Sequence, residues 1–190
     1  IMVAEYGFQG FIAAVARLIL NDNPLTGDFF DADKDISGVT TLFDTLKTSS
    51  VTELGLAKCR LGPGSLGKLA EYVRDAKAAL TSINCLANKF GEDDLATLLT
   101  AIEGTSVRSL CGLTEGQTVA DFSGQNLGPI DCKIMAAEYG FQGFIAALNS
   151  MTVDSTGDMG THWDGKQGKR VSNQIAYIRC YSIIILYIAF

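Results

Sequence analysis

Charge and histidine are both scarce in this chain of 190 residues. Charged residues make up 19% of the sequence and lean acidic, with 15 Lys and Arg against 21 Asp and Glu and a formal net charge of -6. A nucleic-acid-binding domain normally has a basic surface that neutralises phosphates, so we expect no nucleic-acid partner. A single histidine, His162, leaves little material for a catalytic imidazole or a Cys/His zinc site.

Long apolar runs and closely spaced cysteine pairs are also missing. No run of 18 apolar residues occurs, so the sequence predicts no conventional membrane-spanning helix. The cysteines are odd in number and form no C-x-x-C pair, unlike those of a secreted disulfide scaffold. They are Cys59, Cys85, Cys111, Cys132 and Cys180. We therefore expect free, buried thiols and a cytoplasmic or other reducing intracellular compartment.

A near-identical duplication is the first pattern that is present. Residues 1–15 read IMVAEYGFQGFIAAV and residues 134–148 read IMAAEYGFQGFIAAL, so 13 of 15 positions are identical at an offset of 133. Two segments this similar descend from one duplicated unit. Repeats of this kind predict an array of related supersecondary units.

Five lines of apolar residues fit one further template, with a partial line beside the weakest of them. The clearest are Val51-x-x-Leu54-x-Leu56-x-x-Cys59-x-Leu61 and Leu80-x-x-Ile83-x-Cys85-x-x-Asn88-x-Phe90. The other lines begin at Val15, Val107 and Leu148, and the partial line begins at Ala120. Alternating apolar residues over three positions predict a short strand with one buried face. The Asn or Cys that follows is suited to bond backbone groups of the turn.

This pattern resembles the leucine-rich repeat, L-x-x-L-x-L-x-x-N/C-x-L, and its longer units resemble the ribonuclease-inhibitor-like subclass. The resemblance covers about residues 1–160. It implies an α/β solenoid of about five repeats, with short parallel strands on a concave face and helices on a convex face. The first copy of the duplication lacks the lead-in of the second, so we expect the array to be a fragment that continues upstream of Ile1.

Helices are predicted between the strands. Leu66, Leu69, Ala70 and Val73 form one apolar stripe at helical spacing. A second stripe contains Leu95, Leu98, Leu99 and Ile102, and the acidic run 92–94 before it favours a helix start. Pro129 is placed to open a third helix, which the spacing extends over 132–147. Gly62, Pro63 and Gly64 indicate the turn before the first of these helices, not a phosphate-binding loop, because no G-K-[ST] follows.

Two C-terminal segments depart from the pattern. Residues 161–174 are polar and rich in Gly and Lys, which predicts a linker. Residues 175–190 are almost wholly apolar but are shorter than a bilayer span. We interpret this tail as a non-native end of the gene, a terminal strand or helix, or a segment that docks on a membrane surface or partner. Any membrane contact is expected only there.

No catalytic constellation is apparent. His162 lies in the predicted linker, where no rigid scaffold would orient it. The acidic run 28–35 has calcium-like Asp spacing, but it lacks the Gly and terminal Glu of an EF-hand loop, so a solvated loop is favoured. We expect no enzyme activity, no cofactor, no metal site and no small-molecule substrate.

The resemblance implies a protein-interaction module that binds a protein or peptide through the concave strand face and adjoining loops. The alternative is a structural or linker subunit of a larger assembly, docked through its open ends and apolar tail. Under the first interpretation, the expected contact residues are those that follow or alternate with the buried strand positions. They are Asn21, Asp22, Lys58, Asn84, Leu86, Asp121, Ser123, Thr152 and Asp154.

Overall fold

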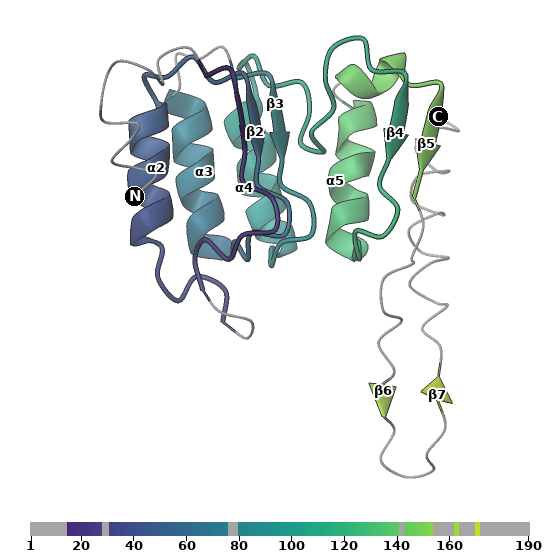
Figure 1. The fold of residues 1–190 in the computed structure, drawn as a ribbon, viewed down its shortest axis with the longest axis horizontal. Helices are drawn as coiled ribbons and strands as arrows, with labels where there is room; N and C mark the ends of the chain where they lie inside the picture. Colours follow the sequence, from purple (N-terminus) through teal and green to yellow (C-terminus); the bar gives the residue numbers. More distant parts are fainter. Residues whose placement is uncertain are drawn as a thin grey trace.

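Short strands alternate with helices along the chain (Figure 1). The computed structural model describes residues 15–27, 31–75, 80–140, 143–153, 162–163 and 170–171. The first three strand–helix units contain β1 (Arg17–Ile19), α2 (Ser37–Leu46), β2 (Glu53–Gly55), α3 (Pro63–Asp75), β3 (Ser82–Asn84) and α4 (Glu92–Ile102). They are followed by β4 (Val119–Asp121), α5 (Pro129–Gly140), the 3-10 helix η1 (Phe144–Ala147) and β5 (Ser150–Thr152).

The strands form small parallel sheets in which equivalent residues are aligned. In the first sheet, of order β1-β2-β3, Leu18 is paired with Leu54, and Leu54 with Ile83. Leu54 and Ile83 are buried strand residues, as predicted. Leu56 and Cys85 are buried as well, but each lies just beyond the end of its strand. β4 and β5 form a second parallel pair.

The helices pack α2 on α3, α3 on α4 and α4 on α5, and their apolar stripes meet the strands in one core. Both predicted stripes are confirmed in their main members. α3 buries Leu66, Leu69 and Val73, and α4 buries Leu95 and Leu98. The predicted helix over 132–147 is wrong in its extent, because α5 ends at Gly140 and η1 follows. Two glycines, at 140 and 143, lower helix propensity at this point.

The structure contradicts the predicted solenoid of about five leucine-rich repeats. The described part of the chain is a small α/β fold with four α-helices and two separate parallel sheets, of three and two strands, besides the short pair β6–β7. The line beginning at Val107 forms no strand and makes only isolated bridges, Ser82 to Ser109 and Asn84 to Cys111. The parallel ladder therefore stops after β3 and does not continue into β4.

The break has a physical cause in α5. On the β3 side, the backbone of segment 108–112 does bond to β3; for example, the Ile83 N–H donates to the Ser109 carbonyl at 2.8 Å. The N–H groups of Leu110 and Cys111, however, donate to the Glu138 carboxylate. A backbone donor that a side chain already satisfies is not available to a further strand. A contact between residues 28 positions apart decides this, and the local apolar pattern contains no sign of it.

Other predictions concerned the cysteines and the C-terminal segments. Cys59, Cys85 and Cys111 are free and buried, whereas Cys132 is disulfide-bonded, so the prediction that every cysteine is free is wrong. Within the predicted linker 161–174, the short strands β6 (His162–Trp163) and β7 (Arg170–Val171) pair antiparallel. Cys180 and the apolar tail 175–190 lie outside the described residues, as does the first copy of the duplication up to residue 14. Among the described helices, none is long and apolar enough to cross a membrane.

Candidate protein-binding face

The side chains that flank the buried or partly buried middle residue of each strand of the two parallel sheets form the strand face. Because side chains alternate along a strand, the two outer residues of each three-residue strand lie on the opposite side from the core. In the first sheet these are Arg17, Ile19, Glu53, Gly55, Ser82 and Asn84. In the second sheet they are Val119, Asp121, Ser150 and Thr152, all of which are exposed.

Two large apolar side chains are exposed on the strand face, one in each sheet. Ile19 is 48% exposed and Val119 is 61% exposed. Ile19 packs along Gly55, where an added Cβ atom would lie 3.0 Å from the Ile19 Cδ1 atom. The absence of a side chain at residue 55 therefore lets Ile19 lie flat across the neighbouring strand. Exposed aliphatic groups on a sheet are suited to contact a partner.

Charges beside Ile19 are arranged in opposite-sign pairs. The Arg17 Nε atom lies 2.9 Å from the Glu53 carboxylate across the β1–β2 register. In the turns that follow the same strands, the Lys58 Nζ atom lies 3.9 Å from the Asp22 carboxylate. Exposed pairs of this kind contribute little to stability, and their charges remain within reach of a partner.

Two of the predicted contact residues, both amides, also support the fold. Asn21 and Asn84 are half-buried. The Asn21 Oδ1 atom accepts from the Ala57 N–H at 2.8 Å, and the Asn84 Oδ1 atom accepts from the Leu86 N–H at 3.2 Å. Asp22 is exposed and Lys58 is partly exposed, both with positive φ values in their turns. These four residues lie on or beside the first sheet.

The remaining predicted contact residues divide between surface and core. Asp121, Ser123 and Thr152 are exposed, and the Asp121 carboxylate accepts from the Ser123 N–H at 2.8 Å. Leu86, in contrast, is 0% exposed and belongs to the hydrophobic core, so the prediction that it contacts a partner is wrong. Its position after β3 is a turn position, where the strand alternation no longer sets the side-chain direction. Asp154 lies outside the described residues.

Sequence reasoning missed Val119, Arg17 and Glu53 as members of the strand face. Val119 begins β4 and precedes Asp121 by two positions. Its β-branched side chain at that even spacing was the available signal. Arg17 and Glu53 stand two positions before Ile19 and Gly55, and the same periodicity would have placed them there.

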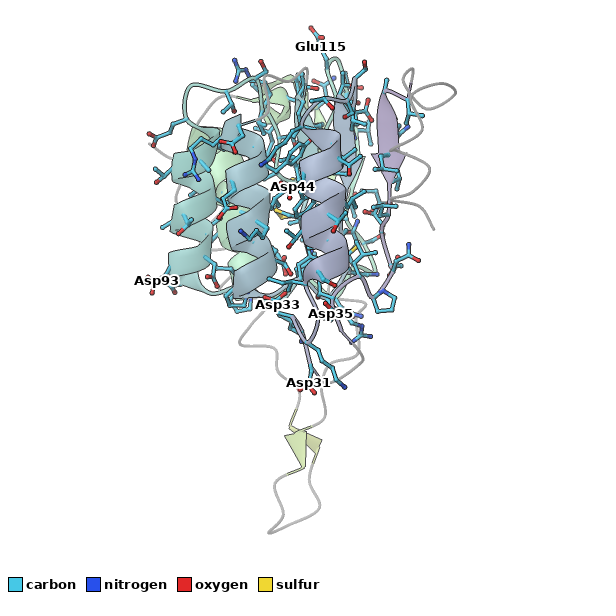
Figure 2. All side chains as sticks on the ribbon, turned by 90° about the vertical axis from the view of Figure 1, so that its left-hand side faces the viewer. Asp31, Asp33, Asp35, Asp44, Asp93 and Glu115 are labelled. Atoms are coloured by element: carbon cyan, nitrogen blue, oxygen red, sulfur yellow. The ribbon has the colours of Figure 1, made fainter. Side chains whose placement is uncertain are left out.

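The acidic loop has a structural role at the start of α3. The Asp33 Oδ1 atom accepts from the Gly62 N–H at 2.9 Å, and its Oδ2 atom accepts from the Ser65 N–H at 3.1 Å. Partial burial raises the pKa of Asp33, but the hydrogen bonds from Ser65 and Gly62 outweigh it, so the net shift is downward. Figure 2 shows Asp33 at the lower end of the helical layer, with Asp31 below it. In the described part of the chain, no group of three or more His, Cys, Asp or Glu residues could hold a metal ion.

Two carboxylates of α5 are buried against the preceding units. Asp131 is 3% exposed and accepts from the Ala87 N–H at 2.7 Å. Glu138 is 0% exposed, and its Oε1 atom accepts from the Ser109 hydroxyl at 2.7 Å and the Cys111 N–H at 2.6 Å. Burial raises the pKa of both carboxyl groups, more than these bonds lower it. Each acid is thus engaged with the fold and not presented to solvent.

Comparison with known proteins gives weak structural similarity to solved structures. No family model matches the chain, and no curated protein matches it. A solved structure described as "Leiomodin-1 Actin-Binding Site 2 (ABS2)" is similar with a TM-score of 0.41 and 11% sequence identity. The match covers 98% of this chain and 86% of that one. At this level of similarity, nothing about the function of this chain follows from it.

Proposed function

We propose that this protein is a non-catalytic interaction module that binds a protein or peptide through the strand face and its adjoining turns. The observation that carries the proposal is the exposure of Ile19 and Val119 on strands of the two sheets. Around them lie exposed polar groups, including Asp121 and Thr152, which are typical of the polar rim of an interface. The buried acids Asp131 and Glu138 are occupied by backbone donors, which supports a structural role for them and no catalytic one.

Site-specific crosslinking tests this proposal. A photo-reactive amino acid at Val119 or Ile19 is expected to capture the same partner, because both residues lie on the strand face. The matched control is the same group at Asp93, an exposed residue of α4 on the helical side (Figure 2). Capture that is equally efficient from Asp93 would contradict a strand-face site.

Binding of the captured partner then measures the contribution of the apolar contact. Val119→Asp replaces an exposed valine with a charge, so it removes apolar contact without creating a cavity in the core. A central interface residue of this kind is expected to weaken binding about tenfold or more. Asp93→Ala serves as the control and should leave affinity unchanged. Unchanged affinity of Val119→Asp, with Asp93→Ala weakened, would place the interface on the helices.

A further inference from the structure

Glu138 occupies the point where the two sheets fail to join. Its Oε1 atom accepts hydrogen bonds from three donors: the Ser109 hydroxyl and the backbone N–H groups of Leu110 and Cys111. Its Oε2 atom is buried with no hydrogen-bond partner. One oxygen of this carboxyl group is therefore saturated, while the other is removed from water with no hydrogen-bond partner of its own. The Cys111 thiol also interacts with the carboxyl group, but it offsets only part of the effect of burial. Burying an unpartnered charged oxygen is far more costly than burying a neutral one.

The same side chain joins two parts of the fold. Glu138 belongs to α5, whereas its donors belong to the segment that lies beside β3. Asp131 lies seven residues earlier, two turns along the same helix, and bonds the Ala87 N–H in the turn after β3. Two buried acids of one helix face thus hold α5 against the preceding units.

We propose that Glu138 is a proton-dependent latch, which holds α5 against the Ser109–Cys111 segment more tightly when its carboxyl group is protonated than when it is charged. The neutral form keeps Oε1 as an acceptor for all three donors and removes the uncompensated charge from Oε2. When the junction opens, water solvates the Glu138 carboxylate, and its pKa returns to the value of an exposed carboxyl group. Closure therefore takes up a proton, and rising pH favours the open junction.

The thiols, the tyrosine and the exposed ion pair near Glu138 would not themselves make the junction open with rising pH near neutrality. Burial raises the pKa of the Cys85 and Cys111 thiols and of the Tyr139 hydroxyl above their usual values, so these groups stay protonated. From α4, Glu92 approaches α5 only as an exposed ion pair with Lys133. Asp131 is the one other buried acid described on this helix face, and its pKa is also raised by burial. A variant of Asp131 must therefore accompany any variant of Glu138.

Hydrogen exchange of the full chain between about pH 4.5 and pH 8 tests the latch. After correction for intrinsic exchange rates, amide protection over residues 107–113 should fall as pH rises. Across the whole transition, protection should fall tenfold for each pH unit by which the Glu138 pKa in the closed junction exceeds that of an exposed carboxyl group. Residues 54–72, which lie outside the junction, should show no such change. E138Q keeps the acceptor but cannot ionise, and it should abolish the pH dependence.

Three further variants sharpen the outcome. D131N should leave most of the pH dependence in place, and D121N, at an exposed acid of β4, should leave all of it. S109A removes one donor to the charged form, so it should move the transition to higher pH. S109A also provides the test if E138Q fails to fold. Flat wild-type protection, an unchanged slope in E138Q, or an unchanged midpoint in S109A would overturn the latch, as would an equal change over residues 54–72.

Discussion

At the residue scale, Asn88 shows how one buried amide joins two neighbouring turns. Its Oδ1 atom accepts from the N–H groups of Cys59 and Leu61, each at 3.0 Å. Its Nδ2 atom donates to the carbonyls of Leu56, Cys85 and Leu86 at 2.8, 3.0 and 3.2 Å. The side chain thus satisfies backbone groups of two turns that no helix or strand satisfies. This is the role that the sequence pattern predicted for the position.

Asn88→Ala should destabilise the protein by about 3 kcal/mol or more, because several buried backbone groups lose their partners together. Asn23→Ala is the matched control, since Asn23 stands at the same place in the pattern but is exposed and donates only to Leu20 and Asn21 carbonyls. Urea denaturation with unchanged m-values measures both losses. Equal losses would show that burial of the amide is not what matters.

At the element scale, the start of α3 depends on a residue from another unit. Asp33 satisfies free N–H groups at this helix terminus and places a negative charge at the positive end of the helix dipole. Local sequence at residues 62–65 predicts a turn there but gives no indication of this partner. Asp33 is consequently held at the helix start and is not simply solvated.

Asp33→Ala should cost about 1 kcal/mol of stability, the usual effect of losing a capping side chain. The lowered pKa also sets a direction with pH. The contribution of Asp33 is present above the pKa of the unfolded chain and is lost as pH falls through the lower folded-state pKa. Thermal unfolding near neutral and acidic pH checks both statements. Asp44→Ala is the control, because Asp44 of α2 forms an exposed ion pair with Lys47. This variant should change the stability little.

At the scale of the whole molecule, three free thiols report whether solvent and reagents can reach the hydrophobic core. Cys59, Cys85 and Cys111 are buried, and burial raises the pKa of Cys59 to about 11 and that of the other two thiols as well. The thiolate is the nucleophile that attacks a thiol reagent, so burial and a raised pKa both slow the reaction. We expect very slow labelling of these residues in the native protein at about pH 8 and rapid labelling in denaturant.

Stability should also fall as pH rises from about 9 towards the raised Cys59 pKa, because the unfolded chain loses thiol protons that the native state retains. Peptide mapping after pulse labelling identifies the residues, and chemical denaturation at several pH values gives the trend. Fast native labelling of Cys85 or Cys111 would show that the junction around Glu138 is open in solution.

Local features of the sequence were sufficient to place several strands and helices. Leu54 and Ile83 in strands, the apolar stripes of α3 and α4, and Pro129 at the first position of α5 all follow from short-range periodicity and helix-end chemistry. On the candidate strand face, the alternation that placed Asn84 and Asp121 also applies to Val119 and Arg17. Leu86 was misassigned because it lies in a turn, where that alternation ends.

The sequence by itself determined which strand and helix residues are buried, because apolar spacing and turn residues act over only a few neighbouring positions. Only the tertiary structure decided how the units join. Glu138 binds the N–H groups of Leu110 and Cys111 and so separates the two sheets, while Asp33 caps a helix from a distant loop. These outcomes depend on competition for backbone donors between residues about 30 positions apart. Such competition exists only once the chain has folded, so no local pattern could have revealed it.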